Sequence, residues 1–297
     1  MTLIASCRAA CLSFLWLACL LPVRASMWVQ TYSAARHYRF YAGADPDNTL
    51  RNANNWSGVG LSDGTRWGTL VSPSFILSAA HWSPGLATMT FYPDNTGANA
   101  VTRTVDAAWQ VSGTDLWVGH LSSAAPSNIA YYPVYADIPE AFLNHEVWVF
   151  GLDSGGGTTN QRIGRNIIDW VGTQTGPWVF GPVLEFAYNT SGPFWVGGDE
   201  QVLVSGDSGG PEFALIDGTF YLAGINYYNW DASDGGLPEG SGGTRVSALI
   251  SQVNAFMAPY GEQLTVVPEP VGLMLLAATF ALPALRRPKR GYSPLAA

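Results

Sequence analysis

Short apolar runs broken by glycine, proline, asparagine and serine recur along the chain between residues 69 and 256. Strands are predicted where these runs alternate with polar residues or are rich in β-branched residues, at 87–92, 101–111, 147–150, 179–186 and 220–228. Short strands at such regular spacing are typical of an all-β barrel or sandwich. One helix is predicted at residues 246–257, because apolar side chains recur there at helical spacing.

Residues 26–66 form an N-terminal extension with a weaker pattern. Within it, residues 36–41 are predicted as a strand, and Asp45-Pro46-Asp47-Asn48 as a turn. The aspartates and asparagines up to residue 55 do not complete a calcium-binding loop, so a polar surface loop is the preferred interpretation. The histidines have no HExxH or His-x-His spacing, so no metal site is predicted.

Residues 1–25 combine an early arginine, an apolar run and compact residues at the end, which is the layout of a secretory signal peptide cleaved by signal peptidase. A lipoprotein signal at Cys19 is the alternative. All three cysteines, Cys7, Cys11 and Cys19, lie in this segment. The remaining chain therefore has no cysteine with which to form a disulfide.

The other end, residues 267–290, has three parts: a Val-Pro-Glu-Pro sequence, an apolar run at 271–285 and a basic cluster. The run predicts a transmembrane segment, with the basic cluster on the cytoplasmic side. This layout resembles the PEP-CTERM sorting signal of Gram-negative bacteria, which implies transient anchoring in the inner membrane and processing by an exosortase. An ordinary tail anchor is the alternative. Residues 259–266 are predicted to be a linker to this signal.

Between residues 26 and 266 the chain carries 8 arginines against 21 acidic residues, a net charge of −13. Such a surface repels nucleic acids and anionic lipids, so no nucleic-acid partner is expected. The acidity is interpreted as a means of keeping a secreted protein soluble, with a preference for basic substrates as the alternative. The scattered tryptophans are interpreted as core residues, and a sugar-binding surface is the alternative.

The most informative stretch is the hexapeptide Gly206-Asp207-Ser208-Gly209-Gly210-Pro211. Ser208 is the candidate nucleophile, and it needs an adjacent base because a serine hydroxyl is barely ionised at neutral pH. Glycines let the backbone turn tightly, so the N–H groups of Gly206 and Ser208 are expected to form an oxyanion hole. Taken alone, the same residues also fit an ordinary turn between two strands.

Two other stretches supply the partners that Ser208 needs. His81 follows two predicted strands, joined by a short turn, and a small-residue Ala79-Ala80 corner. Asp115 begins a later apolar strand. A carboxylate bonded to one imidazole nitrogen fixes the tautomer and leaves the other nitrogen free to take the serine proton. His81 is therefore the candidate base, and Asp115 is the candidate orienting carboxylate.

The order His81, Asp115, Ser208 with these neighbours resembles the trypsin/chymotrypsin-like serine endopeptidases. The Ala223-Gly224-Ile225 sequence and the Arg245-Val246 start of the last helix extend the resemblance. It implies a secreted serine endopeptidase that hydrolyses protein or peptide substrates through an acyl-enzyme. No cofactor is expected for this chemistry. The protein is expected to be a monomer.

The resemblance further implies two six-stranded antiparallel β-barrels with a C-terminal helix. The protease domain would span residues 67–258, with a crossover between the barrels near residues 125–139. A specificity pocket is implied beside Ser208, with Val202 as its floor, Tyr227, Tyr228 and Asn229 in one wall, and Ser241 in the other. Since Val202 is uncharged, an uncharged side chain is expected before the cleaved bond.

The sequence also departs from the family. The Ile-Val-Gly-Gly amino terminus, whose ammonium group pairs with the aspartate before the nucleophile, is absent. Asp207 therefore needs another partner, either an arginine such as Arg162 or Arg165 or backbone donors, and no zymogen cleavage is expected. Tyr227 and Asn229 are larger than the family's usual serine and glycine, which narrows the pocket. A noncatalytic envelope or matrix protein on the same scaffold is therefore the alternative function.

Overall fold

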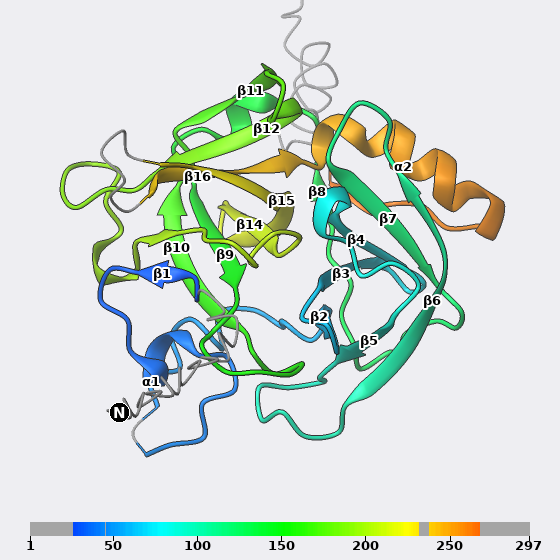
Figure 1. Cartoon of the computed structure of the whole chain (residues 1–297), viewed down its shortest axis with the longest axis horizontal. Helices are drawn as coiled ribbons and strands as arrows, with labels where there is room; N and C mark the ends of the chain where they lie inside the picture. The colour runs from blue at the N-terminus through cyan, green and yellow to red at the C-terminus, as the bar shows by residue number, and fades with distance from the viewer. Residues whose placement is uncertain (1–25, 45, 232–237, 268–297) are drawn as a thin grey trace, which may run out of the picture.

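The structure is a computed structural model that describes residues 26–44, 46–231 and 238–267. Figure 1 shows a barrel on one side and a larger sheet on the other. The predicted signal peptide at 1–25 and the predicted transmembrane segment at 271–285 lie outside the described residues.

The first half of the described chain forms a closed antiparallel barrel in the order β2-β3-β4-β7-β6-β5. Its strands are β2 (Val59–Ser62), β3 (Trp67–Ser72), β4 (Phe75–Ala79), β5 (Thr88–Phe91), β6 (Val101–Gln110) and β7 (Leu116–Leu121). Every residue of β3 and β4 is buried. β2 pairs with both β3 and β5 and so closes the barrel. It lies before residue 67, where the protease domain was predicted to begin, so the barrel starts earlier in the chain than that boundary.

The second half forms a seven-stranded antiparallel sheet in the order β10-β9-β14-β15-β16-β12-β11. Its strands are β9 (Glu146–Gly151), β10 (Arg162–Ile167), β11 (Trp170–Thr175), β12 (Phe180–Ala187), β14 (Pro211–Ile216), β15 (Thr219–Asp231) and β16 (Pro238–Arg245). The predicted all-β class is confirmed, with one closed barrel of six strands. A second closed barrel is not confirmed, because the two end strands of the seven-stranded sheet, β10 and β11, do not pair with each other.

Two small sheets join distant segments. β1 (Trp28–Val29) pairs with β13 (Gln201–Val202), and β17 (Val266–Val267) pairs in parallel with β8 (Val134–Tyr135). The predicted extension is therefore divided, because β1 lies against the second half while β2 belongs to the barrel. The predicted linker at 259–266 ends by adding a strand beside the crossover.

Helices are few and short in the described residues. They are α1 (Ala34–His37), α2 (Ile250–Met257) and the 3-10 turns η1 (Ala80–Trp82), η2 (Pro139–Phe142), η3 (Gly197–Asp199), η4 (Ser247–Leu249) and η5 (Ala258–Tyr260). α2 confirms the helix predicted at 246–257, although the first turn of that range forms the 3-10 turn η4 instead of α-helix. The strand predicted at 36–41 is wrong. A helical turn there lets Arg36 and His37 both reach the buried carboxylate of Asp199.

The largest apolar cluster joins the two halves of the molecule. It includes Trp67 and Leu77 of the barrel, Phe150 and Phe213 of the second sheet, and Val253 of α2. α2 also packs on the outside of the barrel, where Phe256 stacks on the Trp109 ring of β6 at 5.5 Å between centroids. The apolar face of α2 is thus core, and the two halves are held as one packed unit.

Candidate active site

Strand pairing in the barrel brings the His81 corner to Asp115. β4 and β7 are antiparallel with Ala79 opposite Leu116, so the residues after Ala79 meet those before Leu116. The 3-10 turn η1 then presents the His81 side chain, which is 43% exposed, whereas the Asp115 side chain is 5% exposed. The base is therefore accessible while its carboxylate partner is buried.

Asp115 fixes His81 through both its backbone and its carboxylate. The Asp115 carbonyl accepts the amide N–H of Ala80 at 2.7 Å. Its Oδ1 accepts the amide N–H of His81 at 3.0 Å, and its Oδ2 lies 2.7 Å from His81 Nδ1. Because an ionised carboxylate only accepts hydrogen bonds, Nδ1 carries the imidazole proton. The other ring nitrogen, Nε2, is then an acceptor.

Ser208 completes this arrangement from the other half of the molecule. It lies on the loop between β13 and β14, and its Oγ is 2.9 Å from His81 Nε2. With Nε2 as the acceptor, the Ser208 hydroxyl is the donor. The structure thus brings together the three side chains selected from the sequence, in one chain of hydrogen bonds from Asp115 through His81 to Ser208.

Asp207 holds the Ser208 loop through backbone donors. Its Oδ2 accepts the N–H of Val204 at 2.8 Å, and its Oδ1 accepts the N–H of Leu152 at 2.7 Å. The two arginines considered from the sequence bind elsewhere: Arg162 to Asp153, and Arg165 to Asp199 and Glu146. Burial raises the pKa of Asp207 to about 7, and the backbone hydrogen bonds only partly oppose this rise.

Two glycines of the loop stand where a side chain would be strained or would collide with a neighbour. Gly206 has φ 105°, in the left-handed region that favours glycine. A Cβ at Gly210 would lie 2.4 Å from the carbonyl oxygen of Phe150. The N–H groups of Gly206 and Ser208 have no hydrogen-bond partner among the described residues. Both amides are therefore available to a ligand beside the Ser208 hydroxyl.

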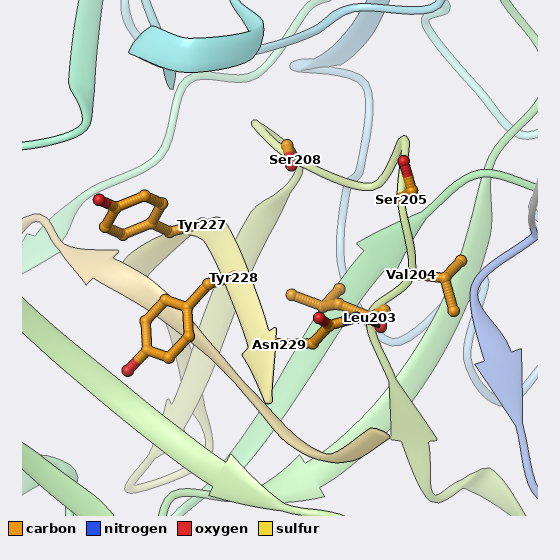
Figure 2. Close-up of a pocket in the computed structure, with 7 residues that line it drawn as sticks. All are labelled: Leu203, Val204, Ser205, Ser208, Tyr227, Tyr228 and Asn229. Atoms are coloured by element: carbon orange, nitrogen blue, oxygen red, sulfur yellow. Dashed lines mark hydrogen bonds between the residues drawn. The ribbon is translucent and has the colours of Figure 1, made fainter. Parts of the chain in front are cut away.

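A pocket of about 340 Å³ opens beside Ser208 (Figure 2). It is lined by Leu203, Val204, Ser205, Ser208, Tyr227, Tyr228 and Asn229, none of which is charged. The Nδ2 group of Asn229 donates to the Leu203 carbonyl at 2.7 Å, so this side chain crosses from β15 to the loop before Ser208. The two residues lie together at the end of the pocket away from Ser208 in Figure 2.

The structure places two of the residues expected in this pocket behind its surface. Val202 is fully buried in β13, where it pairs with Trp28 of β1, and Leu203 lines the pocket instead. Ser241 is also fully buried, and its Oγ accepts the N–H of Leu203 at 2.8 Å. Ser241 therefore supports the pocket lining without forming part of it.

Sequence reasoning did not select Trp178 and Phe180, which lie close to His81 and Asp115 at the turn of the β11–β12 hairpin. The Gly176-Pro177 pair is a turn signal that marks the hairpin. Its position over Asp115 depends on tertiary packing, which local sequence patterns do not encode.

In the part of the chain that the structure describes, no group of histidine, cysteine or acidic side chains is arranged to hold a metal ion. The same described residues contain no helix with the length and hydropathy needed to cross a membrane. His120 is bonded to Asp106, His145 to a backbone carbonyl and His37 to Asp199, so each has a structural partner.

Comparison of the sequence with known protein families and with curated proteins gives no match.

Proposed function

We propose that this protein is a serine endopeptidase of the trypsin/chymotrypsin type, which hydrolyses peptide bonds in protein or peptide substrates through an acyl-enzyme. The observation that carries the proposal is the hydrogen-bonded chain of Asp115, His81 and Ser208, with bonds of 2.7 and 2.9 Å at the two imidazole nitrogens. Each residue type stands where acyl transfer needs it: a buried carboxylate, a partly exposed base and a hydroxyl nucleophile.

The reaction follows from these positions. Ser208 Oγ attacks the carbonyl carbon of the substrate while His81 Nε2 takes its proton, and Asp115 stabilises the imidazolium that forms. The oxyanion accepts hydrogen bonds from the amides of Gly206 and Ser208. The leaving amine takes the proton from Nε2 as the C–N bond breaks. Water then hydrolyses the acyl-enzyme by the same steps in reverse.

The proposal includes the two-barrel fold of this family. β10, at one end of the second sheet, contacts β12 near the other end, which supports closure of a second barrel with β11 appended to it. Catalytic residues would then come from both barrels. The unpaired amides of Gly206 and Ser208 and the open pocket beside Ser208 favour an enzymatic function over a noncatalytic one.

The termini add a proposed location. Residues 1–25 would direct export and be removed by signal peptidase, and residues 267–290 would anchor the protein in the inner membrane until an exosortase processes it. The protein would act as a monomer in the envelope of a Gram-negative bacterium or outside the cell. An amino-terminal sequence of the exported protein that begins well before residue 26 would contradict the first step.

Labelling with a fluorophosphonate probe tests the proposed chemistry. Ser208 is expected to react covalently, and both Ser208→Ala and His81→Ala are expected to abolish labelling, because the first removes the nucleophile and the second its base. Ser83→Ala is the matched control, since Ser83 lies beside the His81 corner but outside the hydrogen-bonded chain. A folded protein that does not label would favour the noncatalytic alternative.

A further inference from the structure

A polar hollow lies where the loop before β2 meets the loop between β5 and β6. The asparagine hollow, as we name it, has a volume of about 360 Å³, within the range of small-ligand sites. Asparagines dominate its lining: Asn48, Asn52, Asn54, Asn55 and Asn95. Among the described residues, it shares none of its lining with the pocket beside Ser208. It is therefore a separate candidate for a binding site.

Buried residues hold the loop before β2 in place. Leu50 is fully buried and Trp56 is 1% exposed, and the Trp56 Nε1 group donates to the Leu50 carbonyl at 3.0 Å. Arg51, which is 3% exposed, donates to the Tyr41 carbonyl at 2.7 Å and to Asn48 Oδ1 at 2.6 Å. The loop is therefore shaped before a ligand arrives, so binding costs little conformational freedom.

The asparagines of the hollow present hydrogen-bond donors. In four of them the side-chain oxygen accepts a hydrogen bond from the protein, whereas the Nδ2 group has no acceptor among the described residues: Asn48, Asn52, Asn54 and Asn55. Each of these Nδ2 groups carries two N–H donors. Asp94, also in the lining, adds an acceptor, since its Oδ1 is bonded to Thr96 while its Oδ2 has no partner in the described part of the chain.

The charges in the lining favour a neutral ligand. Arg51 and Asp94 are the charged residues among the described lining, one of each sign. A carboxylate or phosphate ligand would offer acceptors to the amide groups, but it would also lie against the Asp94 carboxylate, which repels it. A hydroxyl group both accepts and donates, so it can pair with an amide N–H on one side and with Asp94 on the other. The neighbouring hydroxyl groups of a sugar ring fit this mixed lining.

A second hollow continues the first. The tyrosine hollow, as we name it, has a volume of about 340 Å³, includes Tyr131 and Phe220 in its lining, and shares Asn54 and Asn55 with the asparagine hollow. Tyr131 is 48% exposed. The electron-rich face of its ring can stack on the polarised C–H groups of a sugar ring. A chain of several sugar rings can therefore contact the asparagines and Tyr131 at the same time.

From these observations we infer that the two hollows bind one neutral oligosaccharide, or the same length of a polysaccharide chain. The asparagines hold its hydroxyl groups, and Tyr131 stacks on one of its rings. Trp56 takes no direct part, because it is 1% exposed although it belongs to the same lining. The site does not depend on the proposed peptidase function, and it would hold the protein on a carbohydrate surface while the pocket beside Ser208 stays open.

Isothermal titration calorimetry of the exported protein with defined sugars tests the inference. The probes are neutral tetrasaccharides of glucose, mannose, galactose or N-acetylglucosamine, the corresponding monosaccharides, and tetragalacturonic acid as the anionic probe. At least one neutral tetrasaccharide is expected to bind with a Kd below about 1 mM, and about tenfold or more tighter than its monosaccharide, because only the longer chain reaches Tyr131. Tetragalacturonic acid is expected to bind more weakly than that tetrasaccharide, since it lies against Asp94.

Variants assign the binding to the two hollows. Asn54→Asp keeps the shape of the side chain and its oxygen but removes the Nδ2 donors, so the tetrasaccharide should bind about tenfold more weakly. Asn144→Asp makes the same change at an exposed asparagine outside both hollows, and it should leave the affinity within about twofold. Tyr131→Ala should reduce the advantage of the tetrasaccharide over the monosaccharide to about threefold or less, and Tyr131→Phe, which keeps the ring, should restore it.

Three results would overturn the inference: no neutral tetrasaccharide binds at about 10 mM, Asn54→Asp binds as tightly as Asn144→Asp, or tetragalacturonic acid binds most tightly of all the probes. Fluorophosphonate labelling of the same samples keeps the two proposals apart. Labelling without sugar binding would leave the proposed function standing and remove the inference. Sugar binding without labelling would support the inference and contradict the proposed function.

Discussion

Two histidine–aspartate pairs in the barrel have nearly the same geometry, yet only the His81 pair lies beside the candidate nucleophile Ser208. His81 Nδ1 lies 2.7 Å from Asp115, and His120 Nδ1 lies 2.6 Å from Asp106. The Asp115 side chain is 5% exposed, whereas that of Asp106 is 45% exposed and screened by water. Only His81 has a serine hydroxyl on its other nitrogen. These differences favour the His81 pair, and not the His120 pair, for the proposed catalytic role.

Asp115→Asn is expected to lower kcat on a peptide substrate about a thousandfold or more. The amide would keep the shape of the side chain, but it would no longer hold the proton on Nδ1 and would not stabilise the imidazolium. Steady-state kinetics with one fluorogenic peptide measures the effect. Asp106→Asn makes the same chemical change in the exposed pair, and it should leave kcat within about twofold. Equal losses in both variants would contradict the assigned role of Asp115.

The candidate catalytic residues could be selected from the sequence because each stands in a short motif whose chemistry is local. The pocket could not be read in the same way. Val202 was expected at its floor, but the pairing of β13 with β1 buries Val202 and leaves Leu203 to line the pocket. In a strand, a shift of one residue moves a side chain to the opposite face. The partner residue of Val202 is Trp28 of β1, 174 positions away in the sequence, and this distant pairing decides which face Val202 occupies.

At the scale of elements, the alternating and apolar runs predicted the positions of the strands. The local pattern failed where contacts with distant residues determine the secondary structure. β6, predicted at 101–111, spans Val101–Gln110, and β12, predicted at 179–186, spans Phe180–Ala187. The strand predicted at 36–41 was wrong, since α1 (Ala34–His37) extends into its first two residues. The helical form of α1 depends on Asp199, which is far away in the sequence.

The crossing of Asn229 from β15 to the opposite loop is expected to limit the size of the side chain beside Ser208. Asn229→Gly removes the bond to the Leu203 carbonyl and opens that end of the pocket. The ratio of kcat/KM for phenylalanine over alanine before the cleaved bond is expected to rise about tenfold, since a hydrophobic pocket distinguishes side chains by such amounts. Peptides that vary only at this position measure the ratio.

Two results would contradict these expectations for the pocket beside Ser208. If the native protein already cleaves after phenylalanine as fast as Asn229→Gly does, the Asn229 side chain does not limit the pocket. Cleavage mainly after arginine would contradict the uncharged lining itself, because a buried cation needs a paired carboxylate.

At the scale of the whole molecule, aromatic packing holds the two halves without any cysteine in the described residues. The Trp56 ring is 1% exposed and lies 5.2 Å from Phe150 and 5.1 Å from Phe213, between ring centroids. Phe150 in turn meets Trp67 of the barrel at 6.4 Å. Since His81 and Ser208 come from different halves, the geometry of the site depends on this shared core.

Buried carboxyl groups in the second half give the molecule a second global property. Glu212 is fully buried on β14, and neither of its carboxyl oxygens has a hydrogen-bond partner among the described residues. Burial therefore raises its pKa well above the usual value of 4.5. Burial also raises the pKa values of Glu200 and Asp207 to about 7. The folded state thus binds protons that the unfolded chain has already released near neutral pH.

The thermal midpoint of unfolding is therefore expected to fall as the pH rises from 5 to 8. Each raised pKa gives stability that is fully present below its unfolded value and is lost as the pH rises through its folded value. Glu212→Gln keeps the shape of the side chain but removes its titrating group. The fall in the thermal midpoint between pH 5 and 8 should therefore be smaller in this variant, by about 3 °C for each unit of pKa shift removed. Glu140→Gln, at an exposed position, is the control and should leave the slope unchanged. Calorimetry across this range decides the matter: a slope in Glu212→Gln as steep as in the native protein would mean that Glu212 ionises freely in the folded state.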